Sequence, residues 1–384
     1  MRTGVFLFGG VEMDDAGAGP PVPTDRRYTQ QQMWHATQRI LDMGVVSERC
    51  GYDIFWLTEH HFQHEGYEVV PNGILFAATL AERTERIRIG TMFNIVPQWH
   101  PLRLAEDFAY LHNISGGRGI LGVGRGTVPR EAETLGTHIG SFDNPDQARA
   151  DAVNREHFDE AVEVIRTAFE NEIFKFHGKH YSFPPPGIPD RGGFVEHLTL
   201  VPRPLHPVEW WQAVTSPPTL EAAPEKGFGG VFWLKNHRFT KQWWGRYAER
   251  YAECHGTELA PGEKRMLVLN IRIEDSHEQA MASSRPGHDE FWKFLGPYGW
   301  SRGYMGKDGK PAAAGLIPTL EESIENRTWV VGTPEEVAVG IEEYRRELGG
   351  LADLCLFPNF PGDPYAKTEE QLIRYAEEVR PLLG

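Results

Sequence analysis

The sequence predicts one α/β domain in which eight parallel strands and the helices between them close into a (β/α)8 barrel, or TIM barrel. Short apolar runs alternate along the chain with longer segments whose apolar residues recur at helical spacing, which is the pattern of consecutive βα units. The 384 residues show neither a linker nor an internal repeat, and a barrel of this length is ordinary. We therefore expect a single domain over residues 1–384, with insertions after the fourth and seventh strands.

The first half of the chain predicts four βα units. Its expected strands are apolar runs that end at glycine or polar residues: residues 4–8, 54–57, 87–92 and 120–123. Helices follow where an apolar face recurs, starting at Thr29, at Asn72 and at His100, with a fourth over residues 158–169. Residues 129–154 are polar and rich in turn formers, so this segment predicts the first insertion.

The second half predicts the other four units. The expected strands are residues 209–214, 230–233, 266–271 and 354–357. Ser216 before Pro217 is typical of a helix start, with serine as the cap and proline in the first turn. Further helices are expected over residues 239–254, from Ser276, from Thr333 and over residues 372–382. A small hairpin can pair residues 175–176 with 181–183, and the long aromatic-rich segment 286–326 is expected to be functional or mobile.

Composition narrows the function classes. The net charge is −15, from 39 basic and 54 acidic residues, and no basic cluster predicts a nucleic-acid partner. The three cysteines, Cys50, Cys254 and Cys355, lie far apart and follow no metal or redox spacing, which indicates a reducing compartment. The chain shows no long apolar leader and no run of transmembrane length, so we expect a soluble, cytoplasmic protein without a membrane partner.

A cluster of polar side chains follows the expected strand 54–57. Glu59, His60 and His61 come directly after this apolar run, and His64 is nearby. In a barrel, the carboxyl ends of the strands carry the chemistry, and a histidine there can hold or transfer a proton near neutral pH. A metal site and an ordinary surface loop are the alternatives. Two adjacent histidines point to opposite sides, which argues against a shared metal.

Two other strand ends carry groups that suit a phosphate. Arg125 lies among glycines in residues 122–126, and a guanidinium can bind a phosphate with two hydrogen bonds. Ser216 and Thr219 stand at the expected helix start, where hydroxyls and free backbone N–H groups can hold an anion. Each feature alone also fits a glycine-rich strand end or a plain helix cap. Because strand ends converge on one face of a barrel, the two together predict one phosphate site.

Aromatic residues are the third feature of the predicted barrel mouth. Trp233 ends the expected sixth strand, and residues 286–326 contain several tryptophans, tyrosines and phenylalanines. These side chains can cover a flat ring or an apolar substrate, and core packing is the alternative.

The order of several motifs resembles bacterial luciferase-like flavin monooxygenases. Residues 59–62, Glu-His-His-Phe, are similar to a signature of that family. Further similarities follow in family order at residues 90–92, 97–101, 105–107, 114–118, 125–126 and 331–336. The resemblance covers nearly the whole chain, from about residue 4 to residue 382, and no single motif carries it.

The resemblance implies a barrel that binds reduced FMN and reacts it with O2 through a C4a-(hydro)peroxyflavin to oxygenate a small, apolar organic substrate. It assigns His60 as the catalytic histidine beside the flavin. It also assigns a set of cofactor-binding residues: Met92, Phe93 and Asn94 under the ring, often with a non-prolyl cis peptide, and Arg125, Ser216 and Thr219 at the phosphate. Trp233 joins the expected cofactor-binding residues as an aromatic side chain that can cover a flat ring. The same resemblance implies a separate flavin reductase, a homodimer and a mobile lid over residues 286–326.

Two departures from the family pattern leave alternatives open. Luciferases carry a reactive cysteine where this chain has Gly124, and an acidic residue where it has Thr215, which argues against light emission. An oxidoreductase that transfers hydride with the deazaflavin F420 shares the barrel. A metal-dependent hydrolase and a non-catalytic partner subunit are the remaining alternatives, and we expect no metal.

Overall fold

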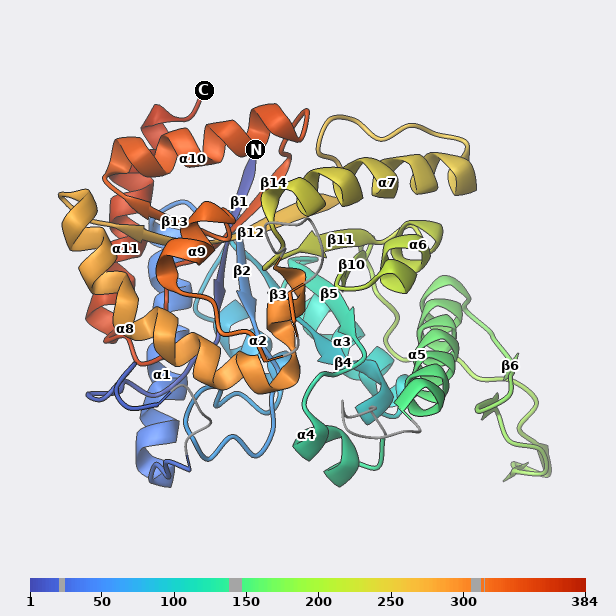
Figure 1. The fold of residues 1–384 in the computed structure, drawn as a ribbon. Helices are drawn as coiled ribbons and strands as arrows, with labels where there is room; N and C mark the ends of the chain where they lie inside the picture. The colour runs from blue at the N-terminus through green and yellow to red at the C-terminus, as the bar shows by residue number, and fades with distance from the viewer. Residues whose placement is uncertain (21–24, 138–146, 305–311, 314) are drawn as a thin grey trace.

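The computed structural model describes residues 1–20, 25–137, 147–304, 312–313 and 315–384. Eight parallel strands close into a barrel, as predicted (Figure 1). They are β1 (Arg2–Leu7), β2 (Ile54–Leu57), β3 (Arg88–Thr91), β5 (Gly119–Gly124), β10 (Glu209–Ala213), β11 (Gly229–Phe232), β12 (Arg265–Ile273) and β14 (Asp353–Phe357). Neighbours in chain order pair with each other, and pairing of β14 with β1 closes the ring. Each predicted strand therefore corresponds to one strand of the barrel.

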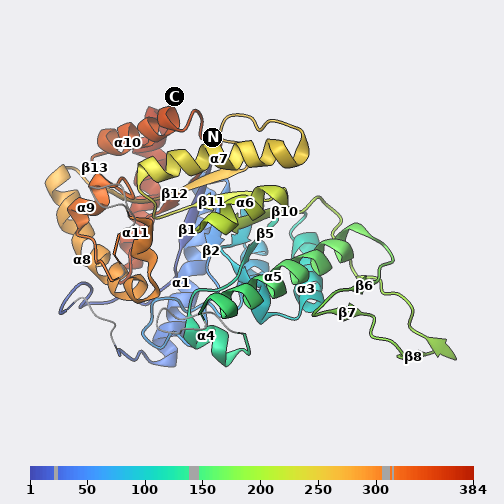
Figure 2. The ribbon, with the colours of Figure 1, turned by 45° about the vertical axis from the view of Figure 1, so that its right-hand side comes forward.

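Helices surround the barrel at the places predicted along the chain, except that the helix expected over residues 372–382 begins earlier, at Tyr365, and ends as an α-helix at Arg374 (Figure 2). They are α1 (Gln30–Arg49), α2 (Gly73–Ala81), α3 (Pro101–Ile114), α5 (Gln147–Glu170), α6 (Pro217–Glu225), α7 (His237–His255), α10 (Pro334–Glu347) and α11 (Tyr365–Arg374). Side chains of Thr29, Asn72 and Thr333 accept hydrogen bonds from the first turns of α1, α2 and α10. After α11 the chain continues as a π-helical turn, Tyr375–Val379. Every helix that the structure describes is too short or too polar to cross a membrane.

The barrel strands are buried on both faces, which is why they read as continuous apolar runs. On β1, Val5 and Leu7 belong to the core between the strands and the outer helices, whereas Phe6 belongs to the core inside the barrel. Trp56 and Trp211 meet edge to face inside, with ring centroids 6.4 Å apart. The interior is thus filled by large side chains, and open space is left at one end.

The amino-terminal end of the barrel is closed by a charged cluster. Glu209 at the start of β10 accepts hydrogen bonds from Arg2 at 2.9 and 3.2 Å, from Trp211 at 2.7 Å, and from Arg88. Arg2 also contacts Asp353 on β14 at 2.6 Å. Burial would raise the pKa of Glu209, but the two guanidinium groups outweigh it and lower the pKa to about 2. This cluster ties β1, β3, β10 and β14 together at the amino-terminal end of the barrel.

The first insertion follows β5 and holds more structure than predicted. Residues 129–154 contain α4 (Pro129–Thr134) and the first turns of α5, two helical parts that the polar, turn-rich sequence did not predict. The apolar stripe that predicted a helix begins only at Phe158. The earlier turns of α5 are polar and contact Arg125 through Asp151 and Asn154.

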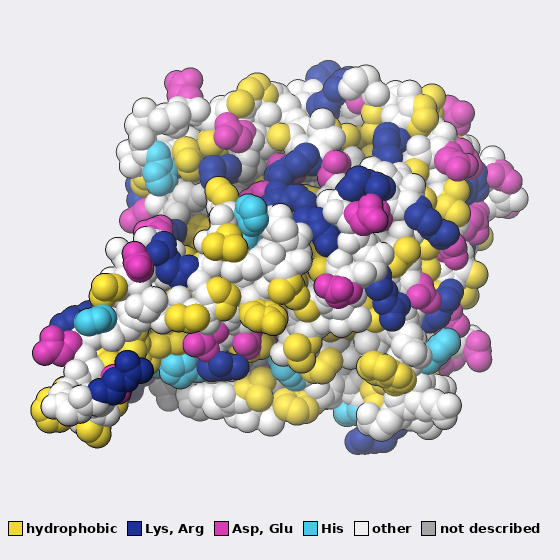
Figure 3. All heavy atoms as spheres, turned by 180° about the vertical axis from the view of Figure 1, so that it is seen from behind, with side chains coloured by type: hydrophobic (Ala, Val, Ile, Leu, Met, Phe, Trp, Pro, Cys, Tyr) yellow, Lys and Arg dark blue, Asp and Glu magenta, His cyan; other side chains and the backbone are white. Residues whose placement is uncertain are grey.

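An arm projects from the barrel beyond α5 (Figures 2 and 3). The predicted hairpin is present, with β6 (Phe176–His177) paired to β7 (Ser182–Phe183). A second hairpin, β8 (Pro189–Asp190) with β9 (Gly193–Phe194), was not predicted. Its strands have two residues each, which is too short for a recognisable alternation.

The second insertion follows β12. Helix α8 (His277–Leu295) runs through residue 286, so the aromatic-rich segment begins as a helix and not as a loop. Pro286 is tolerated inside the helix because Phe291, Trp292 and Phe294 bury their side chains against the barrel. Two short 3-10 turns, Gly296–Tyr298 and Trp300–Gly303, come next. Residues 305–311 and 314 lie outside the described residues, and mobility of the segment stays a prediction.

An unpredicted strand ends the second insertion. After α9 (Leu320–Glu325), β13 (Trp329–Gly332) pairs in parallel with the last four residues of β12, from Asn270 to Ile273. The run Trp-Val-Val is too short to separate from a loop by sequence alone. The insertion therefore leaves and rejoins the barrel at the same strand.

Candidate functional site

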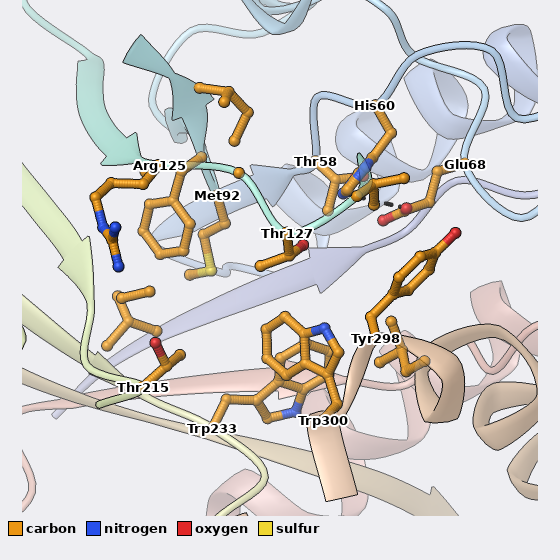
Figure 4. Close-up of a pocket in the computed structure, with 18 of the residues that line it drawn as sticks. Thr58, His60, Glu68, Met92, Arg125, Thr127, Thr215, Trp233, Tyr298 and Trp300 are labelled. Carbon is orange, nitrogen blue, oxygen red and sulfur yellow. Dashed lines mark ion pairs between the residues drawn. The ribbon is translucent and has the colours of Figure 1, made fainter. Parts of the chain in front are cut away.

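A cavity opens at the carboxyl ends of the barrel strands, the end where barrel chemistry occurs. It has an empty volume of about 1140 Å³, which includes its solvent-filled opening. Side chains from opposite sides of the barrel face each other across it (Figure 4). The lining residues include Phe6, Phe8, Thr58, His60, Glu68, Met92, Phe93, Arg125, Thr127, Gln212, Thr215, Thr219, Trp233, Phe294, Leu295, Tyr298 and Trp300. Most of the wall is apolar, and polar groups gather at two ends.

The acid end of the cavity is built around His60. Its Nδ1 lies 3.0 Å from a carboxylate oxygen of Glu131 on α4, and its Nε2 lies 3.1 Å from Glu68. Both carboxyl side chains are at most 2% exposed. Gln63 donates a hydrogen bond to the same oxygen of Glu131 at 3.0 Å. Besides His60, the Thr58 side chain is the other hydrogen-bonding neighbour of the Glu68 carboxyl.

Burial and charge oppose each other in this trio. Burial would lower the pKa of His60, but Glu68 and Glu131 outweigh it and raise the pKa to about 9. For Glu68, burial raises the pKa to about 8, with Glu131 adding to the effect. Burial likewise acts to raise the pKa of Glu131, but the charge and hydrogen bond of His60 bring it below its ordinary value. The three groups therefore share their protons as one coupled system, which can give or accept a proton at the cavity wall.

The neighbours of His60 in the sequence have different partners. Glu59 is fully buried and accepts a hydrogen bond from the indole of Trp99 at 2.8 Å. His61 lies 3.7 Å from Glu59 and is not among the cavity-lining residues. The two histidines thus point to different sites, as expected. In the described part of the chain, no group of three or more His, Cys, Asp or Glu side chains is arranged to hold a metal ion.

The floor of the cavity lies where β3 ends. Met92 and Phe93 both line it, and the peptide bond between them is cis, as the resemblance implied. The structure does not bring the Asn94 side chain to the cavity. It is fully buried, and its Nδ2 donates hydrogen bonds to Thr91 and to the carbonyl oxygen of Gly122. Asn94 therefore ties β4 (Asn94–Ile95) to the neighbouring strands.

The glycines around Arg125 serve separate purposes. A Cβ on Gly122 would lie 1.9 Å from the Thr91 carbonyl oxygen, so this glycine allows close strand packing and not ligand approach. Gly124 and Gly126 do line the cavity, and Gly126 has φ +86°. Such a backbone conformation favours glycine.

Indole rings form one wall. The Trp233 and Trp300 rings lie 5.7 Å apart between centroids and face the middle of the cavity (Figure 4). The Trp233 Nε1 donates to Asn270 at 3.2 Å, which holds this ring in place. Tyr298 lies on the acid side, and burial raises its pKa to about 12, so it stays a neutral hydroxyl.

The anion end gathers the predicted phosphate residues. Arg125 lines the cavity, with its Nη1 held by Asp151 at 2.7 Å, and its guanidinium turns toward Thr215 (Figure 4). Thr219 also lines the cavity, whereas Ser216 caps α6 at its margin. Arg125 and Thr219 therefore share one end of the cavity with Thr215.

The expectation of free backbone N–H groups at this helix start needs correction. The first two residues of α6 are Pro217 and Pro218, which have no N–H. The Thr219 hydroxyl already accepts hydrogen bonds from the N–H groups of Thr215 at 3.2 Å and Ser216 at 3.0 Å. An anion here would be held mainly by side chains.

These groups fit the phosphate and the flat ring of FMN, which the resemblance implied. A guanidinium and hydroxyls stand at one end, and indole rings with a Met–Phe backbone stand in the middle. Sequence reasoning missed Glu68 and Glu131 as site residues, and neither had a sequence signal. Tyr298 and Trp300 belong to the aromatic-rich insertion whose rings were expected at the barrel mouth, and both line the cavity.

The family model and the two relatives described below all carry the name monooxygenase. The sequence profile of the family described as luciferase-like monooxygenase matches residues 1–351. The chain is 26% identical over 331 residues to 4-hydroxyprotoasukamycin monooxygenase of Streptomyces nodosus subsp. asukaensis, covering 83% of this chain and 79% of that protein. It is also 26% identical over 373 residues to the oxygenase component of flavin-dependent trigonelline monooxygenase of Acinetobacter baylyi, covering 92% of this chain and 91% of that protein.

Solved structures share the fold. The oxygenating constituent of 3,6-diketocamphane monooxygenase from Pseudomonas putida, a type II Baeyer–Villiger monooxygenase in complex with FMN, matches with a TM-score of 0.76. The identity is 21%, and the match covers 100% of this chain and 99% of that chain. At this identity the match establishes the barrel and its insertions as a shared architecture.

Proposed function

The chain belongs to the luciferase-like monooxygenase family, and on this premise we propose that it uses reduced FMN and O2 to oxygenate a small, apolar organic molecule. One observation carries the proposal. A single cavity joins a proton-holding trio at one end to a guanidinium and hydroxyls at the other, across an apolar and aromatic middle. That layout suits a phosphorylated flavin with an apolar substrate beside it.

The residues at the anion end would hold the phosphate. Arg125 and Thr219 line the cavity there, and Ser216 stands at its margin. The backbone of Met92 and Phe93 and the ring of Trp233 would flank the flavin. Bound reduced FMN supplies the electrons that activate O2.

His60 is the proposed catalytic residue. Its Nε2 faces Glu68 at the cavity wall, so a proton can move between these two groups and a reacting oxygen atom. Glu131 on the other ring nitrogen fixes the orientation of the imidazole. Phe294 and Leu295 at the end of α8, with Trp300 beyond, cover this part of the cavity and exclude water.

Two kinds of protein partner form part of the proposal. A separate reductase would supply reduced FMN, since the trigonelline enzyme among the relatives is an oxygenase component. A second copy of the chain would cover α2 and α3, where Leu75 is 67% and Tyr110 is 61% exposed. On the face opposite the view of Figure 1, hydrophobic side chains are scattered among charged ones (Figure 3).

The F420-dependent alternative stays distinct and testable. An F420-dependent secondary alcohol dehydrogenase also shares the fold, and such an enzyme would transfer hydride without consuming O2. The decisive experiment is an anaerobic titration of the protein with photoreduced FMN, followed by mixing with O2 and measurement of H2O2. Binding of reduced FMN and slowed oxidation of the bound flavin support the monooxygenase. Binding of F420 without any reaction with O2 would instead support an F420-dependent enzyme that transfers hydride.

His60→Ala tests the assigned catalytic role. The variant is expected to bind reduced FMN as the wild type does but to release more H2O2, because the proton-holding group at the wall is gone. His61→Ala is the matched control, since His61 is similarly buried but contacts Glu59 outside the cavity. Equal H2O2 release by the wild type and His60→Ala would contradict the role.

A further inference from the structure

Lys235 stands at the anion end in a position that no sequence motif pointed to. It follows β11 by three residues, and its Nζ donates a hydrogen bond to the carbonyl oxygen of Thr215 at 3.2 Å. The same ammonium lies 4.0 Å from the centroid of the Trp243 ring. The side chain therefore lies against the residue that immediately precedes the cap of α6.

Lys235 lies in a hollow that is continuous with the cavity. The hollow is lined by seven residues, of which five also line the main cavity: Thr127, Thr215, Trp233, Tyr298 and Trp300. Lys235 and Leu234 are the two additions. A flexible four-carbon side chain at this place can turn its ammonium toward an anion bound beside Thr215.

The anion end lacks the donors that a helix start usually offers. Pro217 and Pro218 remove two N–H groups from the first turn of α6, and the Thr219 hydroxyl is engaged by Thr215 and Ser216. Backbone donors therefore contribute little here.

Arg125 is partly neutralised. Its Nη1 contacts Asp151 at 2.7 Å, and Asp151 also pairs with Arg155 at 3.0 Å. Lys235, by contrast, has no carboxylate partner among the residues that the structure describes. Burial lowers the pKa of Lys235 to about 8, so its ammonium is mostly charged at neutral pH and lacks a counter-ion.

We propose that Lys235 is a phosphate-binding residue that takes the place of the backbone donors removed by Pro217 and Pro218. The inference rests on the proposed use of FMN and adds a residue that makes the site select phosphorylated flavins over riboflavin. The bound phosphate is the counter-ion of the Lys235 ammonium. Lys235 and Arg125 then hold the phosphate from two strand ends, β11 and β5.

The test compares the affinities of reduced FMN and reduced riboflavin under anaerobic conditions. Quenching of tryptophan fluorescence measures the binding of each flavin. The variants are Lys235→Met and Lys235→Arg. Lys264→Met is the matched control, because Lys264 also donates to a backbone carbonyl, that of Gly227 at 2.8 Å, and lies near the Tyr251 ring. Each titration is repeated at several salt concentrations.

Lys235→Met is expected to weaken FMN binding about tenfold, the effect of losing one charge-assisted hydrogen bond at a half-buried site. Riboflavin binding and the affinity of Lys264→Met for FMN should not change. Lys235→Arg should keep most of the affinity, and the salt dependence of FMN binding should be weaker in Lys235→Met.

Three outcomes would overturn the inference. One is an unchanged ratio of FMN to riboflavin affinity in Lys235→Met, while the wild type prefers FMN. Another is an equal loss for both flavins, which would indicate a structural role. If the wild type itself binds both flavins equally or neither, the proposed FMN site fails together with the role of Lys235.

Discussion

Replacing Glu209, at the amino-terminal end of the barrel, by glutamine should lower the free energy of unfolding by an amount that depends on pH. Burial opposes the ionised carboxylate, but Arg2 and Arg88 lower its pKa from 4.5 to about 2. At about 1.4 kcal/mol for each pH unit, this difference stabilises the folded state by about 3 kcal/mol at pH 7. Because the folded pKa lies below the unfolded one, the stabilisation is complete above pH 4.5 and is lost as the pH falls through 2. Near pH 3 the same relation leaves about 1.4 kcal/mol.

Urea unfolding of the wild type and Glu209→Gln at pH 7 and near pH 3 measures this difference. The gap between the two proteins should shrink by about half or more at the lower pH. Glu253→Gln is the control, since Glu253 also pairs with two arginines, Arg246 at 2.8 Å and Arg250 at 3.3 Å, but on the exposed side of α7. It should change stability little at either pH. A Glu209→Gln gap that is absent at pH 7, or equal at both pH values, would refute the reasoning.

Three further predictions concern the cavity. Glu68→Gln removes a charge that helps to raise the pKa of His60, so the imidazole should titrate at lower pH in an NMR titration of labelled histidine; an unchanged pKa would contradict the pairing. Arg125→Met should weaken FMN binding about tenfold or more, whereas Arg155→Met, which loses a contact with the same aspartate outside the cavity, should not. Thr219→Val leaves the N–H groups of Thr215 and Ser216 without their acceptor and should lower the unfolding free energy by about 1 kcal/mol; urea unfolding of that variant measures this.

The sequence predicted the barrel well because its strands are buried on both faces. Runs such as Ile54–Leu57 are apolar throughout and end abruptly at polar residues. The missed elements are short or polar. β13 has four residues, and the first turns of α5 have no apolar stripe because they contact Arg125. At Pro286 the local propensity was misleading, since the burial of Phe291 and Trp292 outweighs the cost of a proline in a helix.

The candidate site was predictable only where it follows a strand directly. His60 and Arg125 come at strand ends, so their convergence follows from the barrel. Glu131 lies 71 residues from His60 in the chain, and no periodicity connects them. Glu68 and Lys235 lie in loops, where only the folded structure shows what the side chain contacts. Pro217 removes an N–H donor from the anion end, and this residue is visible in the sequence. Its consequence becomes clear only when the N–H groups available in the first turn of α6 are counted.

The return of β13 to β12 has a consequence for how this architecture can change. Residues 274–328 depart from and rejoin the chain beside one strand, because β13 pairs with the last four residues of β12. Doubling the length of a loop whose ends already meet costs only about 0.6 kcal/mol in closure entropy. This segment supplies Phe294, Tyr298 and Trp300 to the cavity but none of the eight barrel strands. We therefore expect that this segment can be replaced by one of different length and sequence, which would change one wall of the cavity and leave the eight barrel strands as they are.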